Sequence, residues 1–155
     1  MNIEKILVLA MLVLTTSAQL TAQQKARNAE ESSVLAVVQN FFDALEKQDT
    51  AAFNKMFLPD GRNFSVRELT DSVVIRSQVS KSFRFNSAQI IKERMRSPST
   101  EIKIDGRIAM VWAPYDLWIN DVFSHCGVDV FTLIKSAGGW KIASIAYTLE
   151  KQGCK

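Results

Sequence analysis

Histidine, cysteine and proline are scarce in this sequence, with one histidine, two cysteines and three prolines among 155 residues. One imidazole and two thiols cannot supply a convincing zinc site, so we expect neither a metal nor a cofactor. A glycine-rich phosphate loop and a serine in a nucleophile elbow are also missing from the sequence. Covalent catalysis is therefore not expected.

Dense basic charge is missing as well. The chain has 19 Lys and Arg against 16 Asp and Glu, for a net charge of +3. Lys92, Arg94 and Arg96 alternate along one face of a short segment, but a nucleic-acid surface needs a denser stripe with stacking aromatics. We expect no nucleic-acid partner. Arg94 and Arg96 are interpreted as a solvated face, with contact to an anionic ligand as the alternative.

The N-terminal residues have the pattern of an export signal. Lys5 precedes the apolar run 6–14, and small residues follow with cleavage sites after Ala18 or Ala22. The run is too short to span a membrane stably, so an uncleaved anchoring helix is the less favoured alternative. We expect a signal peptide at 1–22 and one exported domain at 23–155, periplasmic or secreted, with no membrane span after cleavage.

Export would permit a disulfide between the two cysteines, Cys126 and Cys154. Closing that loop would stabilise the fold by roughly 3–4 kcal/mol in the chain-entropy description. The alternative is two unpaired thiols, because Cys154 follows the last predicted strand.

Apolar spacing predicts two helices at the start of the mature chain. Positions 34, 37, 38, 41, 42 and 45 form one stripe, which predicts a helix over 29–47. Asp49 is the expected N-cap of a second helix over 50–57, and the sequence Pro59-Asp60-Gly61 should end it.

The rest of the chain has strand patterns. Short strands are expected at 62–67, 72–77, 89–96 and 101–104, with a short helix within 79–88. The turn Asp105-Gly106 leads into three long strands over 107–119, 122–135 and 140–149. Helices followed by a meander of antiparallel strands predict an α+β fold.

Three segments carry a family resemblance: Asp105-Gly106-Arg107-Ile108-Ala109-Met110-Val111-Trp112-Ala113-Pro114-Tyr115, Phe123-Ser124-His125-Cys126-Gly127-Val128-Asp129, and Gly139-Trp140-Lys141-Ile142. With the preceding helices, they resemble the nuclear transport factor 2-like superfamily, and within it most closely the bacterial putative lumazine-binding proteins. The resemblance implies a cone of curved sheet on N-terminal helices, often dimeric, with an internal pocket. The superfamily includes isomerases, dehydratases, polyketide cyclases and many non-enzymes.

Strand register predicts which polar residues meet. A two-residue turn at Asn120-Asp121 would place His125 opposite Asp116 and Asp129 opposite Trp112, with opposed Cβ atoms within about 5 Å. A two- or four-residue loop at Ser136 to Gly139 would bring Thr148 onto the face that carries His125 and Asp129, and a three-residue loop would place it on the opposite face.

Asp129 is the strongest candidate for a functional residue, because burial in a central strand would raise its pKa. In a purely structural role, the Asp129 carboxylate would instead bond to Ser144, Thr148 or an arginine. His125 would likewise bond to Asp116 or Glu150. Gly127 would permit a bulge or a close backbone approach. Which sheet face lines the pocket stays open. The candidate ligand-binding residues are Trp112, Tyr115, His125, Asp129, Phe131 and Thr148.

Three functions fit these patterns. The first is an exported binder of a small molecule, planar or aromatic, in a homodimer formed through the second apolar face of the sheet. The second is an acid/base enzyme with Asp129, or His125 with Asp116, as catalytic groups. The third is a non-catalytic interaction module whose pocket is filled by Trp112 and Phe131.

Overall fold

The computed structural model describes residues 28–96 and 98–154. The expected signal peptide, residues 1–22, lies outside the described residues. The chain divides after Ser33, and the residues from Val34 onward form a compact unit of their own. Residues 28–33, before the division, are helical. In the described part of the chain, no helix has the length and apolar character needed to cross a membrane.

Both predicted helices are present. The first runs over residues 28–47, and α2 (Thr50–Met56) follows it. Asp49 is the predicted N-cap of α2, and its carboxylate accepts a hydrogen bond of 2.9 Å from the backbone N–H of Ala52. The predicted apolar stripe is confirmed, because the following side chains are at most 7% exposed: Val34, Val38, Phe41, Phe42 and Leu45.

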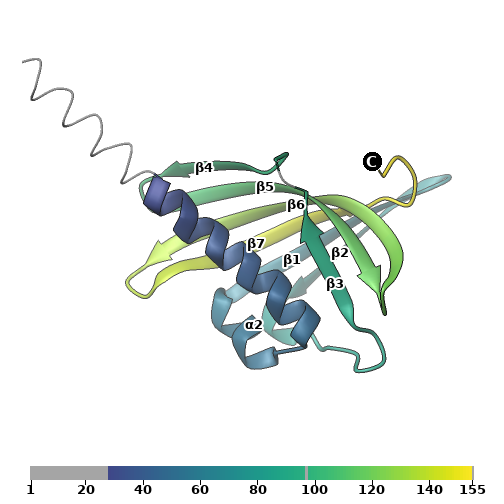
Figure 1. Cartoon of the computed structure of the whole chain (residues 1–155), viewed down its shortest axis with the longest axis horizontal. Coiled ribbons are helices and arrows are strands. Elements are labelled where there is room, and N and C mark those ends of the chain that lie inside the picture. Colours follow the sequence, from purple (N-terminus) through teal and green to yellow (C-terminus); the bar gives the residue numbers. More distant parts are fainter. Residues whose placement is uncertain (1–27, 97, 155) are drawn as a thin grey trace, which may run out of the picture. The chain divides into compact units, whose positions relative to one another are not determined.

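A seven-stranded sheet forms the rest of the unit, in the order β2-β1-β7-β6-β5-β3, with β4 also paired to β5 (Figure 1). Neighbouring strands are antiparallel except β1 and β7, which are parallel. The strands are β1 (Phe57–Leu69), β2 (Ser72–Val79), β3 (Ile91–Met95), β4 (Glu101–Asp105), β5 (Ile108–Ile119), β6 (Val122–Ser136) and β7 (Gly139–Leu149).

The predicted α+β class is confirmed, with two local differences. The expected helix within 79–88 is a single 3-10 turn, Ser80–Ser82. Pro59 and Gly61 do not separate a helix from a later strand, because they lie inside β1 at a register irregularity between Phe57 and Arg62. A proline tolerated at an irregular position in a strand explains why the turn signal failed.

Two one-residue bulges change the predicted strand register. At the β5–β6 turn Ile119 pairs with Val122 as predicted, but beyond Ser124 the register shifts and Leu117 pairs with His125. Between β6 and β7 the shift falls at Ala143. The predicted pairs of His125 with Asp116 and of Asp129 with Trp112 are therefore wrong. Because side chains alternate between faces, a one-residue shift changes which face each partner shares.

The inner face of the sheet forms the core with residues 34–47 of the first helix. Phe131, which is fully buried, packs edge-on against Phe41 and Phe42 at ring-centroid distances of 5.4 and 6.0 Å. Trp112 is 43% exposed, so it does not belong to this core. The third function considered from the sequence requires a pocket filled by Trp112 and Phe131. The exposed Trp112 does not fill a pocket.

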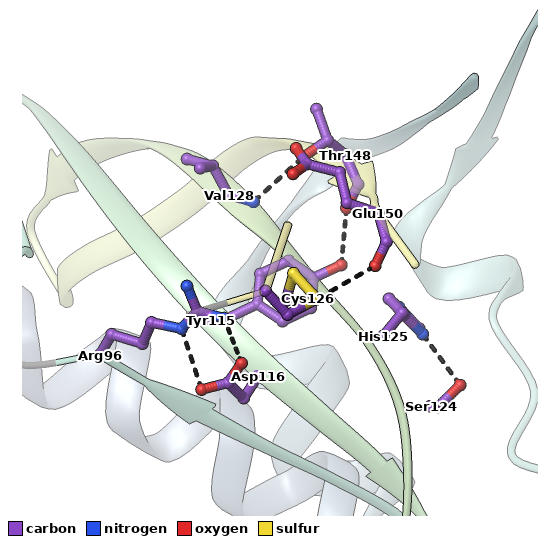
Figure 2. The surroundings of a disulfide bond; sticks show 10 residues. Arg96, Tyr115, Asp116, Ser124, His125, Cys126, Val128, Thr148 and Glu150 are labelled. Atoms are coloured by element: carbon purple, nitrogen blue, oxygen red, sulfur yellow. Dashed lines mark hydrogen bonds and ion pairs between the residues drawn. A yellow bond between two sulfur atoms is a disulfide. The ribbon is translucent and has the colours of Figure 1, made fainter. Parts of the chain in front are cut away.

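A disulfide joins Cys126 in β6 to Cys154 near the C-terminus, with their Cα atoms 5.7 Å apart (Figure 2). The chain after β7 reaches β6 because Glu150 and Cys126 exchange two backbone hydrogen bonds, of 2.8 and 3.0 Å. This crosslink holds the segment after β7 against the first part of β6.

Gly127 allows β6, β7 and Tyr115 to approach closely. A Cβ at this position would lie 2.2 Å from the carbonyl oxygen of Thr148 and 2.9 Å from Cε1 of Tyr115. The same carbonyl accepts a 2.7 Å hydrogen bond from the Tyr115 hydroxyl. The expected close backbone approach at Gly127 is therefore confirmed.

We predict that Gly127→Ala lowers the free energy of unfolding by about 1–3 kcal/mol, because the new methyl group must displace backbone and a buried ring. Denaturant unfolding measures the change. Gly138→Ala is the matched control, since its Cβ would meet nothing closer than the Ser136 hydroxyl at 3.8 Å. Equal stability of both variants would contradict the prediction.

Candidate functional site

A cavity of about 330 Å³ opens between the inner face of the sheet and the helices. Its walls are mostly apolar, and several are aromatic rings from the first helix, α2 and the segment after the 3-10 turn Ser80–Ser82. The polar groups that face it come from β1, β2, β3, β5, β6 and β7. The lining used below comprises Phe41, Phe53, Ser65, Arg76, Phe83, Glu93, Tyr115, His125, Asp129 and Tyr147.

Two carboxyl groups meet inside this cavity. Glu93 on β3 is 6% exposed and Asp129 on β6 is 3% exposed, and their side chains share a hydrogen bond. In the sheet order their strands lie on opposite sides of β5. Glu93 pairs with Leu117, and Asp129 pairs with Ala113 and with Tyr147 of β7.

A hydrogen bond between two carboxyl groups needs a proton on one of them. Burial raises the pKa of Glu93 to about 7, while the hydrogen bond to Asp129 acts in the opposite direction. Burial also raises the pKa of Asp129 well above its ordinary value, and the neighbouring Glu93 raises it further. The shared hydrogen bond lowers the pKa of Glu93 and raises that of Asp129, so the shared proton lies on Asp129 and Glu93 titrates near neutrality.

The oxygen atoms of Asp129 are not all used. Oδ2 is buried and has no hydrogen-bond partner among the described residues. A buried polar atom without a partner costs about 1–3 kcal/mol, so its persistence in a cavity calls for an explanation.

Two tyrosines lie near the pair, and a histidine lines the same cavity. Burial raises the pKa of Tyr115 and of Tyr147, so both hydroxyls stay protonated at neutral pH. The Tyr115 hydroxyl donates to the Thr148 carbonyl, and the Tyr147 side chain hydrogen-bonds that of Ser65. Burial, followed by the charges of Arg67 and Lys151, lowers the pKa of His125, which is therefore neutral at pH 7.

The structure separates the predicted site residues into two groups. Tyr115, His125 and Asp129 line the cavity, as proposed. Trp112 and Thr148 do not line it. The Thr148 hydroxyl accepts a hydrogen bond from the backbone N–H of Val128 and donates to Glu150 (Figure 2). Phe131 lies in the core against the first helix.

Asp116 belongs to a different interaction from the one predicted. Its carboxylate forms a two-pronged ion pair with Arg96, while Nδ1 of His125 lies 3.0 Å from the hydroxyl of Ser124. Figure 2 shows these two groups engaged with separate partners. The predicted catalytic pairing of His125 with Asp116 is wrong, because the bulge at Ser124 moves His125 opposite Leu117. Arg94 likewise pairs with Glu46.

Sequence reasoning missed Glu93 and Arg76. The alternation in β3 contained the signal for Glu93, because Ile91, Glu93 and Met95 share one face while Lys92 and Arg94 share the other. An acid between two apolar residues on one strand face indicates burial. Arg76 is exposed on β2, and no local pattern distinguishes it from other surface arginines.

The arrangement offers hydrogen bonding and proton exchange. Among residues 28–96 and 98–154, no cluster of three or more His, Cys, Asp or Glu side chains could hold a metal ion. The chemistry available from the described side chains is that of a buried, singly protonated carboxyl pair in an aromatic cavity. Such a pair can orient a ligand, or accept and return a proton.

Comparison with known proteins identifies the class. Residues 29–148 match the family described as putative lumazine-binding, so the chain belongs to that family. Its fold is nuclear transport factor 2-like, which confirms the resemblance found in the sequence. A comparison with curated proteins found no match.

Solved structures share the fold at low sequence identity. A nuclear transport factor 2-like superfamily protein from Salmonella enterica is 11% identical with a TM-score of 0.63, covering 83% of this chain and 96% of its own. A protein described as a putative dehydratase from Streptomyces avermitilis is 13% identical with a TM-score of 0.61, covering 79% and 97%. The β subunit of a putative aromatic-ring-hydroxylating dioxygenase from Novosphingobium aromaticivorans is 12% identical with a TM-score of 0.63, covering 84% and 94%.

The raised pKa of Glu93 predicts a pH-dependent stability. Because its pKa is about 7 in the folded protein against an ordinary 4.5, the folded state binds more protons between these values. Stability is then full below pH 4.5 and falls as the pH rises to 7, by about 3 kcal/mol. We predict that Glu93→Gln is more stable than wild type at pH 8 and differs little at pH 4.

Chemical denaturation at a series of pH values measures this effect. Glu68→Gln is the matched control, since Glu68 is exposed on β1 and should leave the pH profile unchanged. A Glu93→Gln protein whose profile matches that of wild type would show that Glu93 has an ordinary pKa.

Proposed function

We propose that this protein binds a small, planar, largely apolar molecule in the cavity. The observation that carries this proposal is the buried Glu93–Asp129 pair inside a cavity with aromatic walls. Small-molecule sites are typically concave and apolar, with a few polar groups that fix orientation. The name of the putative lumazine-binding family supports the same class of ligand.

The aromatic walls favour a flat ligand. Phe53 stacks on Phe83 with ring centroids 5.2 Å apart, and both rings line the cavity. Phe41, which also lines it, packs 5.5 Å from Phe53. A planar body lying against this group of rings gains offset-stacked and edge contacts beyond simple burial.

An acid/base enzyme is the second candidate. The supporting observation is the Glu93 carboxyl, whose pKa of about 7 suits a general base at neutral pH. Asp129 and His125 remain candidate catalytic groups because they line the cavity, whereas Asp116 is held by Arg96. The relative from Streptomyces avermitilis, described as a putative dehydratase, has the same fold.

We also propose that the protein is exported and acts in the periplasm or outside the cell. The supporting features are the signal-like segment 1–22 and the disulfide between Cys126 and Cys154. Disulfides persist in oxidising compartments and are uncommon where thiols are kept reduced.

A native mass spectrum of the protein purified from its own host tests the binding function. We predict that wild-type protein retains a small molecule. Leu149 lines the cavity, so the indole ring of Leu149→Trp would fill part of it. This variant should lower the occupied fraction about tenfold or more, because the indole competes with the ligand for the same volume. Leu69→Trp is the matched control, because Leu69 lies on β1 and is 51% exposed.

An empty wild-type protein that also fails to bind added lumazine or other aromatic probes would contradict the binding function. Asp129→Asn separates the two candidates once a ligand is known. Turnover that disappears while affinity is retained supports an enzyme, and loss of affinity without any measurable wild-type turnover supports a binder.

The outer face of the sheet supports a homodimer. Cross-strand pairs place Ile108 opposite Ile134, and Trp112 opposite Val130. Ile108, Trp112 and Ile134 are 53, 43 and 39% exposed. Neighbouring β4 carries exposed charges of both signs, Glu101, Lys103 and Asp105, which can pair with one another across a two-fold axis. We propose a second copy of this chain as the partner.

Analytical ultracentrifugation tests the dimer. We predict that Trp112→Glu converts it to monomer, because a charge placed in an apolar interface loses its hydration. Val122→Glu at the β5–β6 turn, where Val122 is 70% exposed, should leave it dimeric. Wild-type protein that sediments as a monomer at its highest soluble concentration would refute this assembly.

A further inference from the structure

The acid pair leaves hydrogen-bond acceptors unfilled inside the cavity. Its one proton is used between the two carboxyl groups, so every remaining oxygen of the pair is an acceptor. Oδ2 of Asp129 has no partner among the described residues, although Asp129 is only 3% exposed. What the pair lacks is therefore a donor.

The protein side chains around the pair do not supply that donor. The Tyr115 hydroxyl donates to the Thr148 carbonyl, and no hydrogen bond from the Tyr147 hydroxyl reaches Oδ2 of Asp129. The His125 imidazole is neutral and lies against Ser124. Among the described cavity-lining residues, Arg76 is the one always-charged cation, and it is exposed on β2.

The negative charge of the pair also lacks a positive partner among the described residues. The described groups that act on Glu93 and Asp129 are each other's carboxyls and the surrounding apolar burial, with no basic side chain as a partner. A negative charge in a low-dielectric cavity gains far more from an opposite charge than it would in water. A neutral N–H group would satisfy Oδ2 but would leave the charge of Glu93 unbalanced.

We propose that the inserted end of the ligand is a cationic nitrogen group, an ammonium or amidinium, attached to a flat apolar body. This inference rests on the proposed binding function and specifies the chemical class of the ligand. The N–H groups donate to Oδ2 of Asp129 and to Glu93, and the positive charge balances the pair. Phe41, Phe53 and Phe83 enclose the body, and their ring faces favour a nearby cation.

Proton linkage gives the proposal a second signature. A bound cation stabilises the ionised form of Glu93, so binding below pH 7 displaces a proton from the pair. Binding at about pH 8 displaces almost none, because Glu93 is already ionised. Affinity therefore rises with pH to about 7 and then levels off. Tyr115 and Tyr147 stay protonated, and His125 stays neutral, across the upper part of this range.

Three compounds of nearly equal shape test the inference by isothermal titration calorimetry: benzamidinium, benzamide and benzoate. We expect benzamidinium to bind about tenfold or more tighter than benzamide, and benzoate not to bind. Benzamidinium affinity should fall about tenfold between pH 8 and pH 6. At pH 6 the heat should depend on the ionisation enthalpy of the buffer, since close to one proton is released.

Glu93→Gln supplies the matched variant, because the amide is neutral and brings its own N–H donors. It should bind benzamidinium and benzamide within about threefold of each other, whereas Glu68→Gln, at an exposed position of β1, should keep the wild-type preference. Circular dichroism of both variants verifies that the fold is retained.

The possible failures are distinguishable. Benzamide binding as tightly as benzamidinium, or a preference that survives in Glu93→Gln, overturns the cationic ligand and leaves the proposed binding function intact. The same conclusion follows if lumazine binds and benzamidinium does not. Failure of all three compounds and of lumazine, together with an empty native spectrum, overturns both.

Discussion

One extra residue in β6 determines which side chains reach the cavity. Ser124 has no partner on β5, and past it His125 pairs with Leu117. As a result, Gly127, Asp129 and the residues that follow share a face with Tyr115 rather than with Trp112. Without this bulge, Asp129 would share its face with Trp112 and Asp116. The position of the acid pair depends on it, because Asp129 meets Glu93 on the inner face alone.

The fold could be predicted from the sequence because its signals are local. The stripe from Val34 to Leu45 and the N-cap at Asp49 are properties of neighbouring residues, and the long strands follow from β-branched and aromatic content. The registers next to the turns were also predictable, as the pair of Ile119 with Val122 shows. The bulges at Ser124 and Ala143 have no comparable local signal, because tertiary packing sets where a sheet bends.

The site could be predicted only in part for the same reason. Polarity within a strand pattern identifies Asp129 and His125, and both line the cavity. Tyr115 was expected to bind the ligand but its position on the inner face was not predicted, because the face depends on the register. Glu93 is remote in sequence from Asp129, and their contact follows from sheet curvature and order rather than from spacing. The expected partner of His125 was assigned by counting from a turn, and a single bulge invalidated the count.

The pair combines a structural cost with a functional use. Burying two adjacent acids costs stability at neutral pH, since folding raises the pKa of both groups. The apolar surface buried around the pair offsets this cost. Binding and catalytic sites commonly contain ionisable groups whose pKa values are shifted in this way. The retained proton provides a neutral carboxyl next to a titrating one, in a cavity large enough for a small ring system.

Carbon-13 NMR titration of the side-chain carboxyl carbons tests this central claim most directly. The account predicts that the Asp129 carboxyl is still protonated at neutral pH and that the Glu93 carboxyl titrates near pH 7, each responding to the other. Two independent titrations completed below about pH 5, as for ordinary exposed acids, would contradict it.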